Sequence, residues 1–77
     1  MKNIVWSKDN CFYCMMAKDT LTSRNIEFEE RNVSSGVWTK EQLREAVPTF
    51  KTFPQIFLDD SYIGGYDNLV EHFSKEQ

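Results

Sequence analysis

The first part of the chain changes from a short apolar run to apolar residues at helical spacing. The run NIVW, residues 3–6, is β-branched and aromatic, which is typical of a buried strand. The polar stretch SKDN follows it and supplies turn and capping residues. Apolar residues then recur along one helical stripe, at Phe12, Met15, Met16, Ala17 and Leu21. The pattern predicts a strand, a turn and a helix that ends near Asn25, which tolerates a left-handed backbone.

A half-exposed strand is predicted next, in IEFEERNV, residues 26–33. Its apolar Ile26 and Phe28 alternate with the acidic Glu27 and Glu29, so one face is apolar and the other is polar. The turn sequence SSG closes this strand.

Capping residues mark a second predicted helix. Thr39 followed by Gln42 fits a capping box. Pro48 ends the helix, because the residue before a proline avoids helical geometry. The apolar face of this helix consists of Leu43, Ala46 and Val47.

The last part of the chain predicts a hairpin and a third helix. PQIFLDD, residues 54–60, indicates a strand, and YIGG, residues 62–65, returns beside it after a tight turn. Asp67 is predicted to cap the helix, whose inward residues are Leu69, Val70 and Phe73. The order β-α-β-α-β-β-α indicates an α/β fold. Its leading strands form a parallel pair with a right-handed crossover.

Composition bounds what such a chain can be. Its 77 residues contain no repeat and no linker, so a single domain, residues 1–77, is expected. The chain is 40% hydrophobic and 14% aromatic, which is enough for a compact core. The net charge of −3 argues against a nucleic-acid partner, because that binding depends on clustered Lys and Arg.

The N-terminal residues and the apolar runs bear on location. MKNIVW contains no signal peptide pattern, and no run approaches the roughly 20 apolar residues of a membrane span. We therefore expect a cytoplasmic protein without a membrane partner. Thiols there are mostly reduced, so a cysteine pair is usually catalytic, redox-sensing or metal-binding.

The only two cysteines, Cys11 and Cys14, lie at the predicted start of the first helix. A helix N-terminus carries partial positive charge and free N–H groups, which stabilise a thiolate. We therefore expect the pKa of the Cys11 thiol to be lowered, and Lys8 adds positive charge nearby. Cys14 is placed to attack a mixed disulfide formed on Cys11.

The cysteine pair has two other interpretations, a metal site and inert thiols. A structural zinc site usually takes four Cys or His ligands, and the chain offers only two Cys and His72. His72 is instead expected to be an exposed helix residue, and no metal site is predicted. Two inert, buried thiols are the other interpretation, but the position at a strand–helix junction favours a redox motif.

Three separated segments together resemble the glutaredoxin family, in its small bacterial or phage form. SKDNCFYC resembles the family's Lys-x-x-Cys-Pro-Tyr-Cys segment, and TFPQIF resembles its Thr-Val-Pro-x-Ile-Phe segment. IGGYDNL resembles its Gly-Gly-x-Asp segment. The three occur in the family's order and spacing, and with the element order they cover nearly the whole chain. The resemblance implies a thioredoxin fold, with a four-stranded mixed sheet flanked by three helices.

The resemblance also implies roles for individual residues. Cys11 would be the nucleophile and Cys14 the resolving thiol. Pro54 would be a cis-proline that exposes the backbone of Phe53 to the cysteine part of glutathione. Tyr13 would line the groove beside the thiols.

The other implied contacts meet the charged ends of glutathione. Lys8 would attract the glycine carboxylate. Gly65 and Tyr66, just before a helix, would receive the γ-glutamyl carboxylate at free N–H groups. Asp67 would meet the ammonium group.

The chain departs from the family pattern at three points. Phe12 replaces the usual proline between the cysteines, which changes the thiol environment. Members without this proline sometimes hold a glutathione-ligated iron–sulfur cluster between two subunits. Phe53 replaces valine, and Lys51 stands near the place of a usual arginine as a point charge only.

The expected activity is glutathione-dependent thiol–disulfide exchange on protein disulfides and glutathione mixed disulfides. Glutathione would be a co-substrate, with no tightly bound cofactor. The resemblance extends to ribonucleotide reductase as a partner, and a monomer is the default. Reduction by thioredoxin reductase and carriage of an iron–sulfur cluster remain as alternatives.

Overall fold

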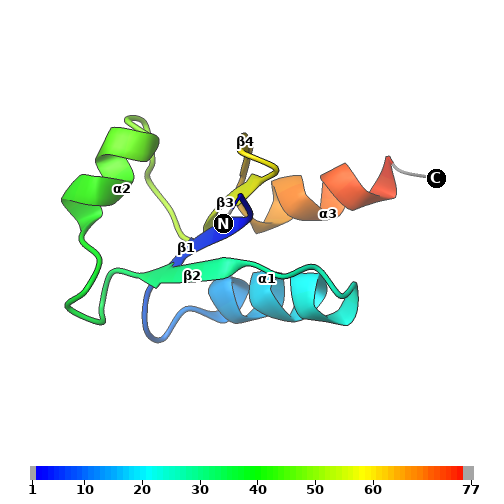
Figure 1. Ribbon diagram of the computed structural model, residues 1–77, viewed down its shortest axis with the longest axis horizontal. Coiled ribbons are helices and arrows are strands. Elements are labelled where there is room, and N and C mark those ends of the chain that lie inside the picture. Colours follow the sequence, from blue (N-terminus) through cyan, green and yellow to red (C-terminus); the bar gives the residue numbers. More distant parts are fainter. Residues whose placement is uncertain (1, 76–77) are drawn as a thin grey trace.

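The computed structural model describes residues 2–75 of the chain. Seven elements follow each other in the predicted order β-α-β-α-β-β-α (Figure 1). They are β1 (Ile4–Ser7), α1 (Phe12–Ser23), β2 (Glu29–Asn32), α2 (Lys40–Ala46), β3 (Gln55–Leu58), β4 (Ser61–Gly64) and α3 (Tyr66–Ser74). Within residues 2–75, none of the helices is both long and apolar enough to cross a membrane.

The four strands form one mixed sheet in the order β2-β1-β3-β4. β1 and β2 are parallel, with Ile4 opposite Glu29, so α1 is the crossover between them. β3 is antiparallel to both β1 and β4. The predicted thioredoxin fold is confirmed, with the parallel pair and the hairpin as expected.

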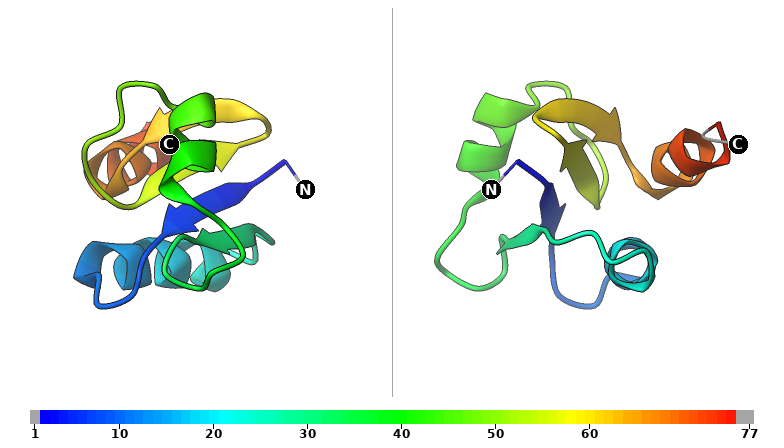
Figure 2. Two further views of the ribbon diagram at one scale, coloured as in Figure 1. Left: turned by 90° about the vertical axis from the view of Figure 1, so that its left-hand side faces the viewer. Right: turned by 45° about the vertical axis from the view of Figure 1, so that its right-hand side comes forward.

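Helices cover both faces of this sheet. Figure 2 shows α2 on one side of the strands and α1 with α3 on the other. Successive residues of a strand point to opposite faces, so Val5 packs under α1 and α3 while Trp6 packs under α2. The hydrophobic cluster on the α1 and α3 side contains seven buried residues: Val5, Ala17, Leu21, Ile56, Leu58, Leu69 and Phe73. The cluster on the α2 side contains three, Trp6, Leu43 and Val47, with partly buried aromatic residues around them.

Local signals fixed the ends of several elements as predicted. Thr39 and Gln42 form the capping box of α2. Val47 is extended before Pro48, so α2 ends there. Asn25 has a left-handed φ of 60° just after α1. The β3–β4 turn carries positive φ at Asp59 and Asp60, which suits a tight hairpin.

In each helix, part of the face that was predicted to be buried is exposed. Phe12 and Met15 are exposed (61% and 49%), and the buried stripe of α1 runs through Cys14, Ala17 and Leu21. Helical spacing gives the period of a stripe, but packing against the sheet selects which of two adjacent stripes is buried. Val70 (46% exposed) in α3 and Ala46 in α2 also point outward.

The second strand is shorter than predicted. β2 begins at Glu29, and the apolar Ile26 and Phe28 precede it. Both residues pack against the core from the connection between α1 and β2. The alternation of apolar and acidic residues over 26–29 therefore comes from burial of the connecting segment and not from a strand. Only residues 29–32 pair with β1.

Candidate active site

The two cysteines lie at the first turn of α1, joined as a disulfide. Cys11 is the N-cap residue, with an extended backbone. Its Sγ accepts a hydrogen bond from the backbone N–H of Cys14 at 3.2 Å. Cys11 is partly exposed, whereas Cys14 is only 2% exposed. Solvent and substrates therefore reach Cys11 first, and Cys14 lies behind it.

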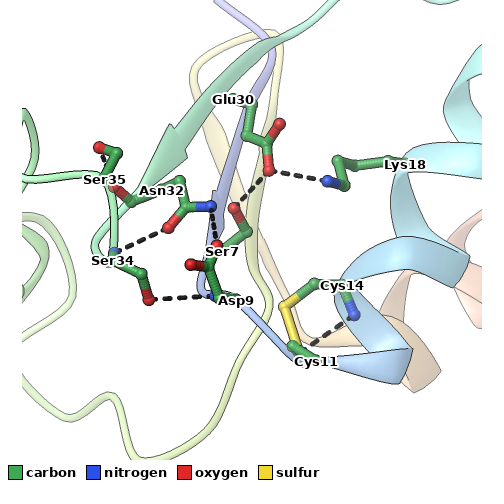
Figure 3. A network of polar contacts seen from close by, with 9 residues as sticks. All are labelled: Ser7, Asp9, Cys11, Cys14, Lys18, Glu30, Asn32, Ser34 and Ser35. Carbon is green, nitrogen blue, oxygen red and sulfur yellow. Dashed lines mark hydrogen bonds and ion pairs between the residues drawn. A yellow bond between two sulfur atoms is a disulfide. The ribbon is translucent and has the colours of Figure 1, made fainter.

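A polar network holds the loop that leads into Cys11 (Figure 3). The N–H of Asp9 donates to Ser34 Oγ at 3.1 Å, and the Asn32 side-chain amide donates to Asp9 Oδ1 at 3.0 Å. Asn32 Oδ1 in turn accepts from the N–H of Ser34 at 2.7 Å. Asn10 takes a left-handed φ of 55°, which turns the chain into the helix. The loop after β2 thus fixes the position of Cys11.

The peptide bond between Phe53 and Pro54 is cis, as the resemblance implied. The carbonyl oxygen of Phe53 lies 3.9 Å from Cys11 Sγ. This backbone therefore borders the sulfur, just before β3 begins. An extended peptide bound beside Cys11 could pair with it.

Two adjoining hollows lie near Cys11, which lines the second of them. The first, of about 480 Å³, contains six predicted contact residues: Tyr13, Phe53, Pro54, Gly65, Tyr66 and Asp67. The second contains Cys11 and Lys8. Tyr13 and Phe53 line both hollows, so the two form one groove past the sulfur.

Aromatic rings form part of the wall of this groove. The rings of Tyr13 and Tyr66 stack with centroids 5.7 Å apart. Phe53 packs edge-on against Phe50, and Lys8 Nζ lies 5.5 Å from the centroid of the Phe53 ring. Lys8, the cation predicted to bind a carboxylate, thus lies over the ring of Phe53.

The start of α3 forms the far end of the first hollow. Gly65 is the N-cap of α3, so the prediction that Asp67 caps this helix was wrong. The helix begins two residues earlier than predicted, and the Asn68 side chain accepts a hydrogen bond from the Gly65 N–H at 3.1 Å. Asp67 is exposed in the first turn. Its carboxylate is therefore available to a ligand in the hollow.

The sequence model of the glutaredoxin family matches residues 3–63. The chain belongs to the glutaredoxin family. It is 37% identical over 71 residues to Glutaredoxin 1 of Rickettsia conorii, covering 88% of this chain and 68% of that protein. It is 34% identical over 70 residues to Glutaredoxin 3 of Escherichia coli strain K12, covering 90% and 83%.

Solved structures agree with this assignment. The crystal structure of glutaredoxin 1 from Francisella tularensis, complexed with cacodylate, is similar with a TM-score of 0.80 and 26% identity. The match covers 96% of this chain and 93% of that one. Family membership together with the Cys11–Cys14 pair makes this glutaredoxin a thiol–disulfide oxidoreductase.

An ion-pair cluster lies on the same side of the sheet as Cys14 (Figure 3). Glu30 on β2 accepts hydrogen bonds from buried Ser7 Oγ at 2.7 Å and from Lys18 Nζ at 2.8 Å. Burial raises the pKa of the Glu30 carboxyl, but the hydrogen bonds from Lys18 and Ser7 and the charge of Lys18 outweigh it. The net direction is a lowered pKa.

Residues 2–75 contain no group of three or more His, Cys, Asp or Glu side chains that could hold a metal ion. His72 is exposed on α3, as predicted.

Sequence reasoning missed several residues of the groove. Lys40, Arg44 and Phe50 line the second hollow beside Cys11. They lie on α2 and in the segment after it, far from the cysteines in sequence. Only the fold shows that Lys40 and Arg44 gather at one place with Lys51.

Proposed function

We propose that this glutaredoxin uses glutathione as its electron donor and reduces protein disulfides and glutathione mixed disulfides. The observation that carries the proposal is the groove. It runs from Cys11 Sγ past the Phe53 carbonyl, 3.9 Å away, to the first turn of α3. An extended tripeptide with a charge at each end suits a groove of this kind.

Each end of glutathione has a candidate partner. Lys8 would attract the glycine carboxylate, and the N–H of Tyr66 at the start of α3 would receive the γ-glutamyl carboxylate, since the N–H of Gly65 already donates to Asn68 Oδ1. Asp67 would meet the ammonium group. The Phe53 carbonyl would accept the N–H of the glutathione cysteine, which places the sulfur beside Cys11.

The reaction follows from the unequal exposure of the two thiols. The Cys11 thiolate attacks one sulfur of the disulfide, and the other sulfur leaves as a thiolate that takes up a proton. Where the mixed disulfide joins Cys11 to glutathione, a second glutathione attacks the bound glutathione sulfur, releases the Cys11 thiolate and leaves as oxidised glutathione. Where it joins Cys11 to a protein, Cys14 attacks the Cys11 sulfur, releases the protein thiol and forms the Cys11–Cys14 disulfide, which two glutathione molecules reduce. The N–H of Cys14, 3.2 Å from Cys11 Sγ, would stabilise the attacking thiolate.

The test is glutathione-dependent reduction of a glutathionylated peptide, coupled to NADPH through glutathione reductase. Wild type, Cys11→Ser and Cys14→Ser are run in parallel. We expect Cys11→Ser to be inactive, since the attacking sulfur is lost. Cys14→Ser should keep substantial activity, because glutathione can resolve the mixed disulfide directly.

Two further measurements, made beside this assay, separate the alternatives. If the wild type is inactive with glutathione but is reduced by thioredoxin reductase, the glutathione proposal is wrong. If the protein becomes brown after anaerobic reconstitution with iron and sulfide, and shows no turnover, cluster carriage is the better description. Equal activity of Cys11→Ser and wild type would remove Cys11 from the nucleophile role.

A further inference from the structure

A chain of hydrogen bonds links β4 to the segment before Pro54. Gln55, the first residue of β3, is only 4% exposed, and its Nε2 donates to the carbonyl oxygen of Thr52 at 2.8 Å. The hydroxyl group of Tyr62, on β4, donates to Oε1 of the same Gln55 side chain. All three residues line the first hollow. We call this chain, from Tyr62 through Gln55 to Thr52, the Gln55 bridge.

The Gln55 bridge holds backbone that lies between two elements. Residues 51–54 follow α2 and precede β3, outside the helices and strands. The Thr52 carbonyl and the Phe53 N–H belong to one planar peptide group, so a hydrogen bond that fixes the carbonyl also orients Phe53. The carbonyl oxygen of Phe53 lies 3.9 Å from Cys11 Sγ. The bridge thus supports the backbone that the proposed function pairs with glutathione.

The Tyr62 hydroxyl keeps the Gln55 side chain in the orientation that reaches Thr52. A buried amide is costly when one of its polar atoms loses its partner, so Gln55 depends on the bond to Oε1 as well as the bond from Nε2. The ring of Tyr62 is held separately, because it packs beside Phe57 with centroids 5.4 Å apart. The ring contact and the hydroxyl contact can therefore be separated by substitution.

We infer that Tyr62 is a positioning residue for glutathione, acting through Gln55 on the backbone at Phe53. This inference rests on the proposed function and identifies what holds that site in shape. Among the described residues, neither Tyr62 nor Gln55 lines the second hollow, which contains Cys11. Loss of the bridge should therefore weaken the fit of the glutathione backbone and leave the reactivity of the Cys11 sulfur unchanged.

The test compares two disulfides of one peptide in a single turnover. In one substrate the peptide cysteine is joined to glutathione, and in the other it is joined to 2-mercaptoethanol, which has no peptide backbone. Pre-reduced protein is mixed with each substrate, and loss of the intact peptide disulfide gives a second-order rate constant. The ratio of the two constants measures how much the glutathione backbone contributes, because Cys11 attacks both substrates.

Tyr62→Phe is the decisive variant, since it keeps the ring and its contact with Phe57 and removes the hydroxyl group alone. We expect its rate constant for the glutathione disulfide to fall about fivefold, the effect of one net hydrogen bond. Its rate constant for the 2-mercaptoethanol disulfide should stay within twofold of wild type. The matched control is Ser74→Ala, which removes a hydroxyl that donates to the Glu71 carbonyl at 2.9 Å on α3, outside both hollows. This control should keep the wild-type ratio.

A second variant tests whether Tyr62 acts through Gln55. Gln55→Met removes both hydrogen bonds of the bridge and should lower the ratio at least as much as Tyr62→Phe. The double variant should have the same ratio as Gln55→Met alone, because the hydroxyl then has no amide to hold. Additive losses would mean that Tyr62 contacts glutathione by itself, and the inference would be wrong.

The remaining outcomes are distinguishable. If Tyr62→Phe keeps the wild-type ratio, or slows the reaction with both substrates alike, the inference is wrong and the proposed function stands. If wild type reacts equally fast with both substrates, the protein does not recognise the glutathione backbone. The proposed glutathione site then fails, and the inference fails with it.

Discussion

Glu30 shows how one side chain ties the sheet to the helix that carries the cysteines. It lies on β2 and accepts hydrogen bonds from Ser7 on β1 and Lys18 on α1. Its pKa is raised by burial but lowered further by these two partners, so the net direction is down. A carboxyl with a lowered folded-state pKa stabilises the fold above its unfolded pKa. That contribution is lost as the pH falls through the folded value.

We therefore predict that Glu30→Gln changes the pH dependence of stability. The difference in free energy of unfolding between wild type and this variant should be greatest near neutral pH. It should shrink below the ordinary carboxyl pKa of 4.5. Because Glu30 and Lys18 are about a third exposed, the difference should not exceed about 1 kcal/mol. Urea unfolding at several pH values measures it.

Glu71→Gln is the control for this prediction. Glu71 pairs with Lys75 at 3.7 Å on an exposed face of α3, where ion pairs contribute little. Its difference from wild type should stay nearly constant with pH. A constant difference for Glu30→Gln as well would show that the Glu30 pair does not stabilise the fold.

The junction between β4 and α3 depends on a glycine backbone. Gly64 has a φ of +118°, and a Cβ there would lie 2.5 Å from Asn68 Oδ1. The same Asn68 oxygen accepts the hydrogen bond from the Gly65 N–H. A side chain at Gly64 would therefore strain the backbone and displace the group that holds the start of α3.

We predict that Gly64→Ala lowers the free energy of unfolding by about 2–4 kcal/mol, from backbone strain and a lost hydrogen bond. Gly36→Ala is the matched control. Gly36 also has a positive φ, +86°, but a Cβ there meets no atom within 4 Å. That variant should lose only about 1–2 kcal/mol. Equal losses measured by urea unfolding would show that the contact with Asn68 does not matter.

Elements set by neighbouring residues were predictable from the sequence, and elements set by packing were not. Thr39 with Gln42, and Asn25 after α1, act over a few residues, so their roles could be deduced from local sequence. The buried stripe of α1 depends on how the helix sits on the sheet. Spacing alone therefore wrongly favoured Phe12 and Met15.

The candidate site likewise contains residues that the sequence predicts and residues that only the fold brings together. The cysteine pair and the residues around Pro54 and Asp67 lie in recognisable segments, so they could be proposed from the sequence. The second hollow joins Lys8 to Lys40 and Arg44, which only the folded chain brings together. No local pattern in α2 distinguishes these two residues from other exposed helix cations.

At the scale of the whole molecule, the two faces of the sheet have unequal cores. The hydrophobic cluster under α1 and α3 contains seven buried residues, whereas the cluster under α2 contains three. α2 has only seven residues and contributes a single buried side chain within the helix, Leu43. A helix this short depends on packing and capping for its stability. We therefore expect α2 to open locally more often than α1 or α3.

Native-state hydrogen exchange measures this difference. The backbone amide of Leu43, which donates to Thr39 within α2, should exchange faster than the amide of Leu69 near the start of α3. Thr39→Ala removes the capping hydrogen bond and should destabilise α2 by about 1 kcal/mol. Exchange at Leu43 should then be about fivefold faster, because it scales with the open population, while exchange at Leu69 should not change. If both amides accelerate together, the molecule opens as one unit, and α2 with its Lys40 and Arg44 is as rigidly held as the cysteine helix.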